Sequence, residues 1–178
     1  MTDLSSEVMA SIKSQTANAT VAATDGGWTL TMSREFAHPA SRVWEMITRP
    51  ELLQQWSPVV PDRPLTYAGP ATSQETPASA PVDAEVLASE APQLLVHRWG
   101  SHTLRWTITP TKQGCRLMLQ HLFPNPDERG MYAAGWHICL AVLDVVIGGR
   151  SVERVVGARA GDYGWAGLRQ EYDALLWG

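Results

Sequence analysis

Histidine is the residue type in this sequence that could do the most chemistry, and three of the five histidines follow one pattern. His97, His102 and His121 have inward parity on predicted strands that we expect to lie near one another. Polar groups in an apolar interior need partners, so these imidazoles either bond to neighbouring side chains or are available to a ligand. Satisfied core histidines are the simpler interpretation. A metal site is disfavoured, because no helical histidine pair or nearby carboxylate completes a ligand set.

Aromatic and small residues extend this group into a candidate ligand site. Trp56, Trp99 and Trp106 could form the aromatic walls of a cavity. Gly135 either opens space beside a helix or allows close packing against a sheet, and the sequence favours neither. Arg34 lies on the apolar face of a strand, where it either pairs with an internal carboxylate or extends its charge to water. The candidate ligand-binding residues are Arg34, Trp56, His97, Trp99, His102, Leu104, Trp106, His121, Gly135 and Ile138.

No catalytic motif accompanies these residues. The sequence has no nucleophile elbow, phosphate-binding loop or paired carboxylates, and its Ser, Cys and His residues form no recognisable triad. Cys115 and Cys139 lack the close spacing of metal knuckles or redox pairs, so we interpret both as buried thiols. We therefore expect no cofactor and no metal, and name no catalytic residue.

The element that must position the candidate site is the segment from Asp127 to Gly149, which is apolar on nearly every side. Acidic residues at its start complement the helix dipole, and the glycine pair at its end provides a left-handed stop. The polar stripe formed by His137 and Asp144 is too narrow for a helix that lies on a surface. The rest of the chain must therefore enclose this helix.

Strands account for most of the enclosure. Alternation of apolar and polar residues predicts strands over residues 28–36, 84–89, 94–99, 102–109 and 115–123. The last four have short connections and are expected to be antiparallel neighbours. Two short helices follow the first strand, one after Pro39 and one from Pro50. This order predicts an α+β helix-grip fold, in which a curved antiparallel sheet closes around the long helix near the C-terminus.

The length of 178 residues suits one domain. Residues 1–26 are rich in Ser, Thr and Ala and are expected to form a flexible tail, with residues 27–178 as the domain. Residues 57–82 contain six of the 12 prolines and are expected to form a loop. An extra amphipathic helix is predicted over residues 162–177.

Charge and the absence of targeting signals limit the partners and the compartment. The net charge of -4 and the lack of a basic run argue against nucleic acid and against anionic membranes. The first residues do not fit a signal peptide, so we expect a cytoplasmic protein. The sequence leaves open whether the protein forms a homodimer.

Three segments resemble a known family. REFAHPASRVWEMITRPELLQQWSP resembles the opening signature of the START-like (SRPBCC) superfamily, in the branch named for the activator of heat shock protein 90 ATPase. GCRLMLQHLF with AAGWHICLAVLDVVIGG is similar to the last strand and helix of that branch. VVGARAGDYGWAGLRQEY is similar to the tail of its single-domain bacterial members. The resemblance runs from about Trp28 to Tyr172 and implies the helix-grip fold of START domains and the birch pollen allergen.

The sequence departs from that family in two places. The Pro-rich segment replaces a glycine-containing strand, which leaves the strand count and the cavity wall there open. The eukaryotic co-chaperones of the family also have an N-terminal chaperone-binding domain, which 26 Ser/Thr/Ala-rich residues cannot supply. We therefore expect no chaperone partner.

The function expected from these observations is the binding of a small hydrophobic or aromatic molecule between sheet and helix. The alternative is a polyketide cyclase or dehydratase, as the resemblance implies for some relatives, in which His97, His121 or Arg34 acts by positioning. A chaperone-linked interaction module is the second alternative.

Overall fold

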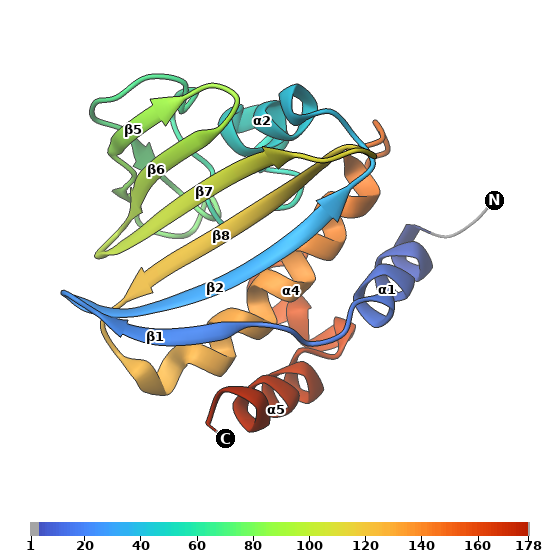
Figure 1. Cartoon of the computed structure of the whole chain (residues 1–178). Coiled ribbons are helices and arrows are strands. Elements are labelled where there is room, and N and C mark those ends of the chain that lie inside the picture. Colours follow the sequence, from blue (N-terminus) through green and yellow to red (C-terminus); the bar gives the residue numbers. More distant parts are fainter. Residues whose placement is uncertain (1–3, 178) are drawn as a thin grey trace.

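A six-stranded antiparallel sheet and one long helix form the centre of the molecule (Figure 1). The computed structural model describes residues 4–177. The strand order is β1-β2-β8-β7-β6-β5. The strands are β1 (Thr20–Thr24), β2 (Gly27–Phe36), β5 (Val86–Glu90), β6 (Leu94–Trp99), β7 (His102–Pro110) and β8 (Cys115–Phe123). The predicted α+β helix-grip architecture is confirmed.

The long helix, α4 (Arg129–Val146), follows the short 3-10 turn η1 (Pro126–Glu128) and runs along one face of the sheet (Figure 1). Its buried residues are distributed around the whole helix, as the narrow polar stripe predicted. Gly149 ends the segment in the left-handed region at φ 92°, where its N–H donates to the Val146 carbonyl at 2.9 Å. The helix is therefore enclosed.

The inward faces of the strands also agree with the sequence pattern. Leu30, Met32 and Phe36 of β2 are buried, and so are the alternate residues of β7 and β8. Two short helices follow β2, namely α2 (Ala40–Thr48) and α3 (Pro50–Leu53). Pro50 begins α3, where its missing N–H removes no helical hydrogen bond.

The prediction of a flexible tail over residues 1–26 is wrong for residues 4–26, and residues 1–3 lie outside the described part. Residues Leu4–Ser14 form α1, and β1 pairs with β2 at the edge of the sheet. The side chain of Val8 is 0% exposed and that of Ile12 is 5% exposed. Both pack in the main core, so packing rather than intrinsic helix propensity stabilises this short helix.

Residues 57–82 form an irregular loop, as expected, with one two-residue strand pair, β3 (Thr72–Ser73) and β4 (Val82–Asp83). The loop is anchored, however, because Val59 and Leu65 are buried in the core. Arg63 also donates hydrogen bonds to four backbone carbonyls within the loop.

The C-terminal segment consists of the 3-10 turn η2 (Gly157–Tyr163) and α5 (Trp165–Leu176), close to the predicted 162–177 helix. Tyr172 of α5 is buried and donates a hydrogen bond to His137 Nδ1 of α4 at 2.7 Å. Across residues 4–177, no helix combines the length and the apolar character that crossing a membrane requires.

Candidate ligand-binding site

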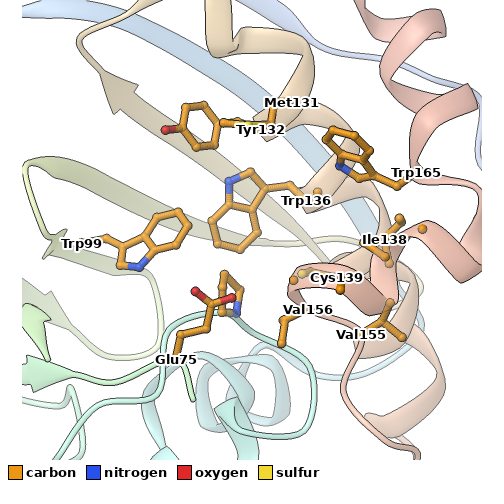
Figure 2. Close-up of a pocket in the computed structure, with 16 residues that line it drawn as sticks. Glu75, Trp99, Met131, Tyr132, Trp136, Ile138, Cys139, Val155, Val156 and Trp165 are labelled. Carbon is orange, nitrogen blue, oxygen red and sulfur yellow. The ribbon is translucent and has the colours of Figure 1, made fainter. Parts of the chain in front are cut away.

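A cavity of about 560 Å³ lies beside α4, with the end of β6 at one side and the C-terminal segment opposite (Figure 2). Most of its lining is apolar or aromatic. The lining residues are Pro58, Glu75, Trp99, Met131, Tyr132, Gly135, Trp136, Ile138, Cys139, Val155, Val156, Gly157, Ala158, Ala160, Gly161 and Trp165.

One stripe of α4 provides the helical wall. Met131, Gly135, Ile138 and Cys139 follow the spacing that places residues on a single helix face. A Cβ built on Gly135 would meet no heavy atom within 4 Å. Of the two interpretations of Gly135, the structure therefore supports open space rather than close packing against the sheet.

Residues 155–165 provide the opposite wall, with Val155, Val156 and Trp165 among the lining residues. Arg154 joins this segment to the Pro-rich loop. Its guanidinium donates hydrogen bonds to the carbonyl of Ser57 at 2.9 Å and to the carbonyl of Glu75. Two segments far apart in sequence are thereby held together around the cavity.

Polar groups in the lining are few and mostly occupied. The Tyr132 hydroxyl donates to Glu128 Oε2 at 3.1 Å, and burial together with this hydrogen bond raises the pKa of Tyr132. Burial raises the pKa of the Cys139 thiol to about 12, so this sulfur stays protonated and is a poor nucleophile. Trp136 donates its indole N–H away from the cavity, to His121 Nδ1 at 3.0 Å.

His97 is a satisfied core residue. Trp106 Nε1 donates to His97 Nε2 at 3.1 Å, while His97 Nδ1 lies 3.0 Å from the Arg98 carbonyl. These partners assign the proton to Nδ1 and leave the ring neutral. Burial lowers the pKa of His97 to about 4, in agreement with a ring that cannot readily accept a second proton.

His121 and His102 form a pair next to Trp136. Because His121 Nδ1 accepts from Trp136, its Nε2 carries the proton and donates to His102 Nδ1 at 2.8 Å. Burial, and then the neighbouring His102, lower the pKa of His121 to about 3. The ring of Trp99 lies against both histidines, with centroid distances of 6.0 Å to His102 and 5.8 Å to His121. The histidines therefore support the aromatic wall from behind.

Arg34 lies in a different place, beneath α1. It is buried, and its Nη2 donates to Ser11 Oγ at 3.3 Å, while Ser11 Oγ donates to Asp144 Oδ2 at 3.0 Å. Burial lowers the pKa of Arg34, and the charge of Asp144 opposes this shift. Of the two interpretations, the structure supports an internal partner, reached through a serine, over a charge extended to water.

The structure thus brings only part of the candidate set to the cavity. Trp99, Gly135 and Ile138 line it, whereas the other candidates do not. Those outside the lining are Arg34, Trp56, His97, His102, Leu104, Trp106 and His121. The strand residues among them point into the packed interior, because inward parity on a strand leads there, whereas the cavity lies to the side of α4. Trp56 follows α3 and packs edge-on against Trp106, also away from the cavity.

Several lining residues were not predicted. Met131 precedes Gly135 by four residues, so the helical spacing could have indicated it. No periodic sequence pattern assigns Glu75 or the segment around Val155 to the cavity, and their position in its wall follows only from the folded structure.

A family model described as "Activator of Hsp90 ATPase homolog 1-like protein" matches residues 37–148, which is more than half of the chain. The chain belongs to this family. The match spans α2 to the end of α4, and the resemblance inferred from the sequence is confirmed. The activator of Hsp90 ATPase homolog 1-like domain here also carries α1, β1, β2 and the C-terminal segment outside the matched region.

Solved structures show the same fold. The conserved protein of unknown function EF2215 from Enterococcus faecalis is 14% identical, with a TM-score of 0.72, and the alignment covers 93% of this chain and 95% of that chain. The crystal structure of CalU16 from Micromonospora echinospora is 16% identical, with a TM-score of 0.65, covering 89% and 95% of the two chains. DynU16, from the dynemicin biosynthetic locus, is 20% identical, with a TM-score of 0.62, covering 71% of this chain and 50% of that chain. No curated protein matches significantly.

Proposed function

We propose that this protein binds a small hydrophobic or aromatic molecule in the cavity beside α4. The observation that carries the proposal is the cavity itself, whose volume of about 560 Å³ falls within the range of small-molecule sites, roughly 300–1,000 Å³. Its lining joins the apolar stripe of α4 to the aromatic rings of Trp99, Tyr132 and Trp165. The displacement of water from such a surface by an apolar molecule is favourable.

The placement of Gly135 supports the same proposal. Glycine in a helix interior lowers helix stability, by roughly 1 kcal/mol relative to alanine. Here the missing side chain leaves open space in the cavity wall and relieves no close contact.

Catalysis has less support from the geometry. Among the described residues that line the cavity, none is a histidine or an arginine. His97 and His121 already use both ring nitrogens and are held neutral, so neither is placed to transfer a proton to a cavity ligand. The cyclase alternative would need one of these residues to face the cavity, and the chaperone alternative is supported only by the family description.

The proposal is tested by thermal shift and intrinsic tryptophan fluorescence with flavonoid-like compounds, sterols, fatty acids and aromatic amines. A ligand at 100 times its Kd stabilises the folded protein by about 2.7 kcal/mol, which raises Tm by roughly 5–10 °C for a chain of this size. Trp99 and Trp165 lie in the cavity wall, so binding should also change the tryptophan emission.

A matched pair of variants locates the binding. Ala160 lines the cavity, whereas Ala166 is exposed and lies outside it. Ala160→Phe should weaken binding at least tenfold, and Ala166→Phe should leave it unchanged. Equal binding by both variants, or no response to any compound class, would contradict the proposed function.

A further inference from the structure

Glu75 is the only charged residue among the described residues that line the cavity. Figure 2 shows its side chain reaching into the cavity, with the carboxylate turned toward the space between Trp99 and Trp136. We propose that the ligand is a cationic amphiphile, an apolar or aromatic body that carries a protonated amine, and that the amine lies against Glu75. This inference rests on the proposed function and adds the chemical class of the ligand.

The Glu75 carboxylate forms no direct ion pair among the described residues. Within residues 4–177, none of the eight ion pairs closer than 4.0 Å involves it. Arg154 lies nearby, but both of its terminal nitrogens donate to main-chain carbonyls, those of Ser57 and of Glu75 itself. The charge of Glu75 raises the pKa of Arg154 against the effect of burial, so the two groups interact, yet Arg154 is not part of the lining.

A carboxylate in an apolar wall costs free energy unless a positive charge or hydrogen-bond donors compensate it. An ammonium group brought in by a ligand provides both, because it carries the opposite charge and three donors. Water leaves the cavity when the ligand enters, so the attraction between the two charges is stronger there than in bulk solvent.

The aromatic rings favour the same kind of group. Trp99 and Trp136 have centroids 5.8 Å apart and planes inclined at 63°, and Tyr132 lines the same cavity. The faces of aromatic rings attract cations, and an ammonium near several rings and a carboxylate is stabilised by all of them. Trp136 already donates its N–H to His121, so it offers the ligand ring surface and no hydrogen-bond donor.

Anionic ligands should be rejected. No lysine, arginine or histidine side chain is among the described lining residues, so a ligand carboxylate or phosphate would meet Glu75 without a compensating cation. Fatty acids should therefore bind more weakly than amines with an apolar body of the same size.

The test uses three ligands that share one aromatic body: 2-naphthylmethylamine, 2-naphthalenemethanol and 2-naphthoate. Isothermal titration calorimetry at pH 7 compares the wild-type chain with Glu75→Gln. Wild type should bind the amine about tenfold more tightly than the alcohol, and the carboxylate most weakly. Glu75→Gln should remove the preference for the amine, strengthen carboxylate binding, and leave alcohol binding unchanged.

Glu153→Gln is the matched control, because Glu153 is exposed and lies outside the cavity, so the variant changes the net charge equally. It should retain the preference for the amine. Equal affinity of wild type for amine and alcohol, or equal loss in Glu75→Gln and Glu153→Gln, overturns the cationic ligand while the binding function stands. If none of the three ligands and no compound of the wider panel binds, the proposed function falls, and the cationic ligand falls with it.

Discussion

Gly135 gives the sharpest prediction, because any side chain at this position should stabilise the helix and a large one should also block the cavity. The position is in the interior of α4, and its added Cβ meets open space. Gly135→Ala should therefore gain the helix propensity of alanine without a steric cost. That gain is about 0.8–1.0 kcal/mol, which corresponds to an increase in Tm of roughly 2–4 °C.

A larger side chain at the same position should fill the cavity. Gly135→Leu places four side-chain carbons into the space beside Ile138 and Trp165, since nothing else stands within 4 Å of its Cβ. We expect the variant to fold with at least the stability of wild type and to lose ligand binding by tenfold or more. Urea denaturation followed by far-UV circular dichroism measures the first effect, and titration with a bound compound measures the second.

Two other helical glycines serve as controls. A Cβ at Gly130 would lie 1.9 Å from Asp173 Oδ1, so Gly130→Ala must displace that side chain and should be at least about 1 kcal/mol less stable than Gly135→Ala. A Cβ at Gly167 of α5 meets nothing within 4 Å, so Gly167→Ala should be stabilising without affecting binding. The reasoning is refuted if Gly135→Ala destabilises the protein, or if folded Gly135→Leu binds as well as wild type.

Three further perturbations test the interior. The folded-state pKa of His97, about 4, lies below the unfolded value near 6.5. Between these two pH values the unfolded chain binds more protons than the folded chain, so the free energy of unfolding falls as the pH is lowered through this window. His97→Gln should therefore reduce the loss of unfolding free energy between pH 7.5 and pH 5 by about 2 kcal/mol in denaturant titrations, and an unchanged loss would show that His97 is not held neutral. Val8→Ala should lower the free energy of unfolding by about 2 kcal/mol in the same assay, whereas Ser6→Ala on the exposed side of α1 should change it little. Equal effects of the two variants would contradict the packing of α1 against the core. Trp56→Phe removes the hydrogen bond from Nε1 to the Met46 carbonyl, 3.0 Å long and fully buried, and should cost roughly 1–3 kcal/mol, so a neutral result would contradict its structural role.

The strands and the long helix were predictable because their patterns depend on local chemistry. Each inner strand has one dry face, and period-two alternation records it directly, as in Leu95 and His97 of β6. For α4 the signal was the near absence of a polar face. The pattern did not reveal which inward residues meet. His97 is opposite Leu104 in the register, and it bonds to Trp106 on the diagonal.

The N-terminal helix and the cavity were beyond local patterns. Only Val8, Ser11 and Ile12 of α1 are buried, too few to distinguish a docked helix from a polar tail. The cavity depends on contacts between distant segments, such as Arg154 with Ser57, across 97 positions of sequence. The sequence around either residue does not indicate that the other is its partner.

The wall contributed by residues 155–165 has a consequence for how ligand choice can diverge among relatives. This wall lies wholly beyond residues 37–148, the portion that defines the family. The sheet and α4 can therefore be inherited as a fixed frame, while substitutions at the lining positions near the chain end change the shape of the cavity. Two proteins with the same sheet and long helix can then bind different ligands, and family membership by itself does not identify the ligand.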